Sequence, residues 1–230
     1  MPRQIRPSSL DHVALWTDQR KPLAEFLCDH LGMHVIEETD TFTLVGVDAK
    51  LGKLTLFDAE GPRERGSLHH IALRVGDLGA ATARLPETAA VRPPRDGLVR
   101  FEGPGDVPLA LVQRGGIEFD LDHVLLRLPD REAALAELEG MGFERRDGAL
   151  AVSDRELLVI EGDTGDAERP LLNHIALLVD SADEVQRDAE ERGVEIDDIK
   201  DAPNTFAVFL RGPQGVRVEY VEHKPGFALV

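Results

Sequence analysis

The sequence predicts an α+β fold made of four βαβββ modules that pair into two domains with curved mixed sheets. Two observations support this fold class. A short phrase of the form apolar-x-His-apolar occurs four times, at 10–15, 68–73, 121–126 and 172–177. After each phrase the apolar period changes from that of a helix to that of short strands. A phrase that recurs every 51–58 residues therefore marks the first strand of each module.

A helix signal follows each phrase. In the first module an apolar stripe runs from Leu23 to Leu31, with Pro22 suited to the first turn and Gly32 to the C-terminal cap. The second helix, from the cap residue Asp77 to the breaker Pro86, is expected to be short. The third helix is expected from the cap Asp130 to Gly140, and the fourth from a cap at Asp180 or Ser181 to Gly193.

Strand patterns follow each helix. In the third module Asp147 and Gly148 form a hairpin turn between short β-rich runs. In the fourth module the runs 205–210 and 216–221 flank a turn at 212–215. Each module therefore has three strands after its helix, and the glycine-bearing stretch 113–117 separates two halves. We expect an N-terminal domain over 1–116 and a C-terminal domain over 117–230.

Composition excludes several classes of partner. The 43 acidic residues exceed the 26 basic residues, and the net charge of −17 disfavours nucleic acids and anionic membranes. A basic N-terminus without an apolar run after it, and the lack of 18 consecutive apolar residues, predict a soluble chain that is not exported. The lone Cys28 fits a reducing cytoplasm. A monomer and a homodimer are both compatible with this composition.

Four such modules, the last closing with the motif Gly-Pro-x-Gly-x-x-x-Glu at 212–219, resemble the vicinal oxygen chelate superfamily. This superfamily contains glyoxalases, bleomycin resistance proteins and extradiol dioxygenases. The resemblance covers about residues 8–223 and implies glyoxalase-like domains. Its members differ in chemistry, and some bind ligands without a metal.

Three residues are candidates for a metal site. His123 and His174 occupy the same place on the first strands of the third and fourth modules, and Glu219 lies on the last strand of the fourth. If these modules share a sheet, two imidazoles and one carboxylate converge in the C-terminal domain, as a divalent metal with open positions requires. The resemblance implies the same three residues, because two-domain extradiol dioxygenases bind their metal at the matching positions.

The N-terminal half offers His12 and His70 at the equivalent places, but Ala110 stands where the fourth module has Glu219. Without a carboxylate, this half is expected to hold a vestigial site whose histidines are structural. One metal per chain follows.

The resemblance implies three functions. The first is an extradiol-type Fe(II) dioxygenase acting on a catechol-like or other small molecule with vicinal oxygens, for which Mn, Zn, Ni or Co are alternative metals. The second is a glyoxalase-type metal-dependent lyase or isomerase, and the third is a metal-free binding protein of the resistance type. Asn204, Phe206 and Phe209 are candidate substrate contacts. No catalytic residue is assigned, since Phe209 stands where the dioxygenases have a tyrosine and no histidine lies in 200–204.

Overall fold

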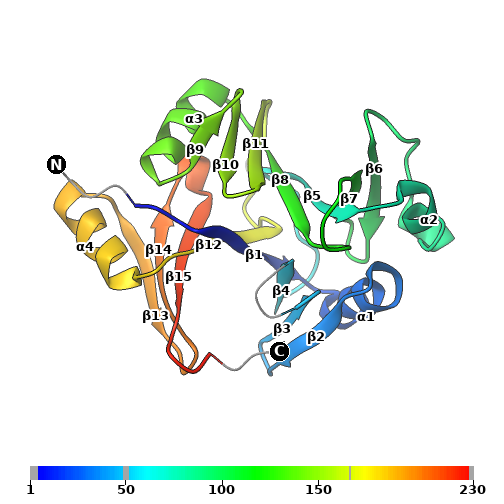
Figure 1. Ribbon diagram of the computed structural model, residues 1–230, viewed down its shortest axis with the longest axis horizontal. Coiled ribbons are helices and arrows are strands. Elements are labelled where there is room, and N and C mark those ends of the chain that lie inside the picture. The colour runs from blue at the N-terminus through cyan, green and yellow to red at the C-terminus, as the bar shows by residue number, and fades with distance from the viewer. Residues whose placement is uncertain (1–4, 49–51, 166, 228–230) are drawn as a thin grey trace.

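The computed structural model of the protein describes residues 5–48, 52–165 and 167–227, and it contains the four predicted modules (Figure 1). Module 1 comprises β1 (Ser9–Thr17), α1 (Arg20–Leu31), β2 (His34–Glu38), β3 (Phe42–Gly46) and β4 (Lys53–Asp58). Module 2 comprises β5 (Leu68–Val75), α2 (Leu78–Thr82), the 3₁₀ helix η1 (Glu87–Ala89), β6 (Leu98–Gly103) and β7 (Val107–Gln113).

Modules 3 and 4 follow the same order. Module 3 comprises β8 (Leu121–Leu128), α3 (Arg131–Gly140), β9 (Glu144–Arg146), β10 (Ala149–Val152) and β11 (Arg155–Glu161). Module 4 comprises β12 (Leu172–Leu178), α4 (Ala182–Arg192), β13 (Ile196–Asp201), β14 (Thr205–Arg211), the 3₁₀ helix η2 (Pro213–Gly215) and β15 (Arg217–His223). Module 2 lacks the first strand of its predicted trio, because η1 and a segment with Pro93 and Pro94 take its place and proline cannot donate to a ladder.

The predicted helix ends are confirmed. Gly32 and Gly193 adopt left-handed conformations, with φ of 60° and 67°, directly after α1 and α4. The side chains of Asp77, Asp130 and Ser181 each accept a hydrogen bond from a backbone N–H of the first turn of their helix. Helix α2 has only five residues, as its weak apolar stripe predicts.

The modules do not pair in the order that the sequence suggests. The eight-stranded sheet has the order β13-β14-β15-β12-β1-β4-β3-β2 and so joins modules 1 and 4. The seven-stranded sheet has the order β6-β7-β5-β8-β11-β10-β9 and joins modules 2 and 3. The expected division into a domain over 1–116 and a domain over 117–230 is therefore wrong, because each sheet contains strands from both halves of the chain.

The reason lies in which strand each module leaves open. In every module the first strand lies at one edge, and two modules join by antiparallel pairing of these strands, β1 with β12 and β5 with β8. All four first strands carry nearly the same phrase, so local sequence fits each of them to any other. The choice of partner is made by packing between distant segments.

The sheets curve around their sites and carry the helices on their outer faces. Figure 1 shows the four helices at the outside of the molecule, whereas β1 and β12 run through its middle. One hydrophobic core extends through both sheets. The hydroxyl of the fully buried Tyr220 on β15 donates to the carbonyl oxygen of Met141, directly after α3, at 2.6 Å. No helix in the described ranges combines the length and the apolar character needed to cross a bilayer.

Candidate metal centre

Each of the four repeated phrases contains an irregularity just before its histidine. The pairing of β1 with β12 shifts register at Asp11 and at Asn173, and the pairing of β5 with β8 shifts at His69 and at Asp122. In a regular strand, neighbouring side chains point to opposite faces. The extra residue of a bulge breaks this alternation, so each of these side chains lies beside the histidine that follows it.

The bulged residues bind the Nδ1 atoms of the histidines. Asp11 Oδ2 lies 2.8 Å from Nδ1 of His12, and Asn173 Oδ1 lies 3.0 Å from Nδ1 of His174. In both pairs the oxygen accepts, so we assign the ring proton to Nδ1. Each Nε2 atom then presents a lone pair to the interior of the eight-stranded sheet. A histidine that ligates a metal is usually held by such a second contact.

These Nε2 atoms meet a carboxylate. Nε2 of His12 lies 3.1 Å from Nε2 of His174, and Glu219 Oε2 lies 2.8 Å from Nε2 of His174 and 3.2 Å from Nε2 of His12. Among the described residues, these three form the group whose ligand atoms all lie within 4.8 Å of one another. The buried Glu219 Oε2 has no hydrogen-bond partner of suitable geometry within the described part of the chain. The arrangement lacks a positive charge at its centre.

The pKa values of His12, His174 and Glu219 also indicate that a positive charge is missing between them. Burial lowers the pKa of His12, but the negative charges of Glu219 and Asp11 and the hydrogen bond with Asp11 outweigh it and raise the pKa to about 9. Burial also lowers the pKa of His174. Burial raises the pKa of Glu219, but the two histidines outweigh it and hold that pKa far below its usual range. Without a metal, a proton on His12 therefore supplies the missing charge.

A cavity of ≈ 430 Å³ opens from this group. Its polar lining includes Lys53, whose buried Nζ lies 2.8 Å from Asp11 Oδ2, and His223, whose Nε2 lies 3.3 Å from Asp11 Oδ1. Its apolar lining includes four phenylalanines, Phe42, Phe57, Phe209 and Phe227. The ring of Phe209 contacts His174 edge-on, with centroids 5.2 Å apart. The cavity thus combines an aromatic wall with a polar end at the histidines.

The predicted ligand set is wrong in one member. The structure brings His174 and Glu219 together, but their partner is His12, which the sequence suggested to be a structural remnant. His123 lies in the other sheet, where its Nε2 is 3.0 Å from Nε2 of His70. The exchange follows from the pairing of modules 1 and 4, because each histidine lies on the first strand of its module. The correspondence of Ala110 with Glu219 is confirmed, since Ala72 pairs with Ala110 as Ala176 pairs with Glu219.

Of the three predicted substrate contacts, Asn204 and Phe209 line the cavity. Phe206 does not, because it packs against the main core on the other face of β14. His223, four residues after Glu219 on the same strand, borders the cavity as its place in the sequence suggested, but sequence reasoning missed Asp11 and Lys53. The missed signal was the residue before each histidine, which is Asp, His, Asp or Asn in strands that are otherwise apolar.

Comparisons with known proteins agree with this architecture. Residues 9–99 match the family model "Glyoxalase/Bleomycin resistance protein/Dioxygenase superfamily". No sequence among the curated proteins matches the chain. A solved structure of a putative dioxygenase from Bacillus subtilis is similar, with a TM-score of 0.80 and 18% identity over 97% of this chain and 88% of that one.

Two further solved structures share the fold. Glyoxalase I from Zea mays, as its E144Q mutant, gives a TM-score of 0.73 at 17% identity, covering 95% of this chain and 94% of that one. The cppA protein from Streptococcus pneumoniae gives a TM-score of 0.64 at 17% identity, covering 95% and 99%. Residues 9–99 are thus similar in sequence to this superfamily, and the fold of nearly the whole chain is shared with these three solved structures.

Proposed function

We propose that the protein binds one divalent metal ion through His12, His174 and Glu219 and uses it as an extradiol-type dioxygenase. The observation that carries the proposal is the convergence of two imidazole Nε2 atoms on a buried carboxylate oxygen without a hydrogen-bond partner. Three acceptor atoms this close repel one another unless a cation lies between them. The donor set therefore fits a metal ion.

The number and type of ligands favour Fe(II). Two histidines and one carboxylate on one face form the set typical of non-haem Fe(II) oxygenases, with the other positions open. Thr55 occupies the position in module 1 that Glu219 occupies in module 4, because Thr55 pairs with Ala14 as Glu219 pairs with Ala176. A hydroxyl at this fourth position adds no negative charge to the ligand set. When bound, Fe(II) would supply Lewis acidity toward a substrate's vicinal oxygens and electrons for dioxygen.

The cavity favours an aromatic substrate of small size. Its phenylalanines offer ring faces and edges at the distances over which aromatic rings pack, as Phe42 and Phe57 do with centroids 5.7 Å apart. Beyond them the polar end holds Lys53 and His223 close to the ligand group. A catechol would place its ring against the phenylalanines and its two oxygens toward His12, His174 and Glu219.

His223 is the chain's candidate for handling the substrate proton. It lines the cavity, its ring stacks on Phe227 with centroids 3.9 Å apart, and Asp11 Oδ1 lies 3.3 Å from its Nε2. The carboxylate would stabilise the imidazolium that forms when His223 accepts a hydroxyl proton. Phe209 cannot share this task because it has no hydroxyl group, so the proposal assigns it to His223 alone.

The test is elemental analysis and oxygen uptake on protein purified without oxygen or chelator. We expect about one iron per chain, loss of iron in His12→Ala, and retention of iron in the matched variant His123→Ala. Oxygen uptake with substituted catechols should follow the iron content.

Three results would count against the proposal. If the protein takes up no divalent metal under these conditions, a metal-free binding protein is the function that remains. If the protein holds iron but takes up no oxygen with any catechol, it is not a dioxygenase. Isomerisation of a hemithioacetal by that protein would then indicate the glyoxalase-type reaction. Loss of iron in His123→Ala but not in His12→Ala would show that the ligand group is wrong.

A further inference from the structure

A second cavity, of ≈ 140 Å³, lies in the seven-stranded sheet beside His70, which corresponds to His174 of the metal centre. His69 and His70 of β5 contribute to its lining, with residues of β6, β7 and β8. Four arginines and one acidic residue also line it: Arg65, Arg92, Arg100, Arg127 and Glu102. In a chain with a net charge of −17, this cavity is a local excess of positive charge.

The strand register shows how the two centres differ. Glu219 of the metal centre corresponds to Ala110, since each pairs with the alanine two residues after its histidine. Phe209 pairs with Glu219 across β14 and β15, and Arg100 pairs with Ala110 across β6 and β7. Phe209 therefore corresponds to Arg100. The second centre therefore has an alanine where the metal centre has its carboxylate, and a guanidinium where the metal centre has a phenyl ring.

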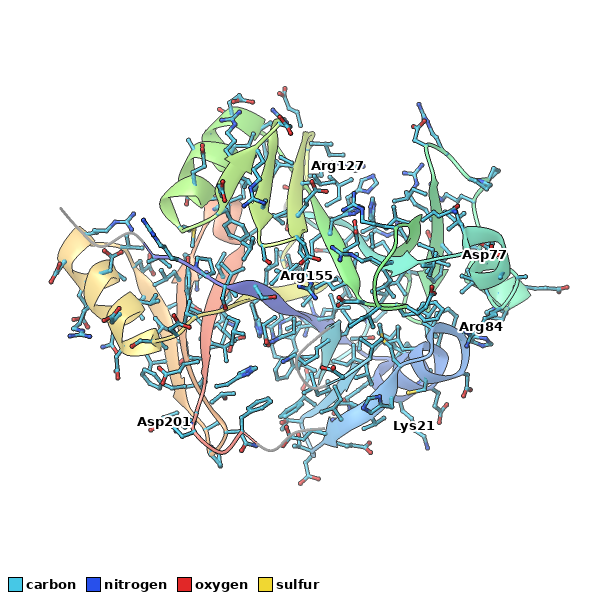
Figure 2. The ribbon with its side chains drawn as sticks, in the orientation of Figure 1. Lys21, Asp77, Arg84, Arg127, Arg155 and Asp201 are labelled. Atoms are coloured by element: carbon cyan, nitrogen blue, oxygen red, sulfur yellow. The ribbon has the colours of Figure 1, made fainter. Side chains whose placement is uncertain are left out.

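Two of the arginines have no acidic partner. Arg65 lies 2.6 Å from Glu102 Oε1, and Arg92 lies 3.6 Å from the same oxygen. Within the described ranges, the guanidinium groups of Arg100 and Arg127 make no ion pair or hydrogen bond. Figure 2 shows Arg127 between β8 and the strand β6 on the opposite side of the curved sheet. Two donor-rich cations thus remain available at the cavity.

The histidines form a connected row beneath these arginines. His69 Nδ1 lies 2.8 Å from His70 Nδ1, His70 Nε2 lies 3.0 Å from His123 Nε2, and His123 Nδ1 lies 2.7 Å from Asp122 Oδ1. With the proton of His123 on Nδ1, His70 donates through Nε2 and His69 through Nδ1, and every imidazole stays neutral. Nε2 of His69 is then the one ring nitrogen of the row without a contact in the described residues, and His69 lines the cavity.

The same arginines act on this row electrostatically. Burial, followed by the charges of Arg127, Arg100, Arg65 and Arg92, lowers the pKa of His69 to about 4. Burial, followed by His123, His69 and Arg100, lowers the pKa of His70 to about 3. Burial is the largest cause in both residues, and the positive potential of the arginines adds to it. An anion that entered would cancel this potential.

We propose that this second cavity binds the phosphate group of a small molecule. Arg100 and Arg127 together carry two charges without a partner, which a phosphate dianion balances and a carboxylate monoanion does not. Guanidinium groups offer paired N–H donors that match phosphate oxygens. The bound dianion would favour protonation of His69 at Nε2, which turns that nitrogen into a further donor. The chain would thus hold a cation in one sheet and an anion in the other.

The test is calorimetric titration of the protein with inorganic phosphate in low salt at about pH 8, where phosphate is mainly a dianion. We expect one phosphate per chain, binding at least about tenfold weaker in Arg100→Gln and in Arg127→Gln, and unchanged binding in Arg95→Gln. Arg95 is the matched control because it is highly exposed, lies in the same module and is not part of the cavity lining. Phosphate should also raise the pKa of His69, followed by NMR, in the wild type but not in Arg100→Gln.

Several outcomes would overturn the proposal. One is the lack of phosphate binding at millimolar concentration, and another is binding that Arg100→Gln and Arg127→Gln leave unchanged. Binding that survives in Arg100→Gln but is lost in His174→Ala would assign the anion to the metal centre instead. If acetate, a monoanion, binds as tightly as phosphate, the proposed preference for a dianion is wrong. Because the three substituted arginines are not buried, loss of folding does not obscure these results.

Discussion

Asp11 Oδ2 lies 2.8 Å from Nδ1 of His12, in the residue directly before the histidine that it orients. The same oxygen lies 2.8 Å from Nζ of the buried Lys53, so the carboxylate is held from two sides. Burial raises the pKa of Asp11, but Lys53 and the histidines outweigh it and hold the pKa well below its usual value. The carboxylate stays ionised and fixes which nitrogen of His12 points at Glu219.

Replacement of this carboxylate should weaken metal binding without removing a ligand. We expect Asp11→Asn to lower the affinity for Fe(II) or Zn(II) by about 10-fold to 100-fold, because an amide orients His12 less firmly and makes its Nε2 less basic. Competition with a chromophoric chelator measures this. Asp122→Asn changes the same residue type at the equivalent bulge of the other sheet and should leave metal affinity unaltered. Equal losses in both variants would mean that the effect is general destabilisation.

The histidine row of the seven-stranded sheet should make the fold sensitive to mild acid. The pKa of His70 is about 3 in the folded chain and near 6.5 in the unfolded chain, so between these values the unfolded state binds more protons. The free energy of unfolding should therefore fall as the pH drops below about 6.5. Urea unfolding at two pH values measures the fall, which His70→Gln should reduce. The exposed His34 provides the control, and an equal reduction in His34→Gln would contradict the assignment to His70.

The correspondence between the two centres predicts that one can be converted into the other. The double variant Ala110→Glu with Arg100→Phe places a carboxylate beside His70 and His123 and restores the aromatic neighbour. We expect elemental analysis to show about two metal ions per chain instead of about one. Arg100→Phe alone should remain at one. A folded double variant that still binds one ion would show that the backbone of the second centre does not fit a metal.

The contact of Tyr220 on β15 with Met141 at the end of α3 should contribute to stability and not to chemistry. Tyr220→Phe removes the hydroxyl that donates to the carbonyl of Met141 at 2.6 Å and leaves that carbonyl buried. We expect the free energy of unfolding to fall by about 1–3 kcal/mol, measured in urea, with metal content unchanged. Loss of metal from folded Tyr220→Phe would instead couple this contact to the neighbouring residue Glu219.

In this protein the sequence predicts local structure better than it predicts which modules pair and which histidines meet. Gly32 and Gly193 end helices where expected, because capping depends on a few neighbouring residues. The ligand group was predicted with His123 in place of His12, since both stand in nearly the same phrase on the open strand of a module. Which of them meets His174 depends on the packing of segments far apart in the chain. The orienting role of Asp11 depends on a bulge, which alternation in the sequence does not show.

The exchange of partners between modules also sets an order of events during synthesis. Modules 2 and 3 are consecutive, so their sheet can assemble as soon as both have left the ribosome. Module 1 is made first but must wait for module 4, because His12 and His174 are 162 positions apart. Until then the open strand β1 and its apolar face have no permanent partner, which exposes the nascent chain to wrong pairing. The growing polypeptide should therefore assemble the arginine-lined cavity early and the group of His12, His174 and Glu219 last.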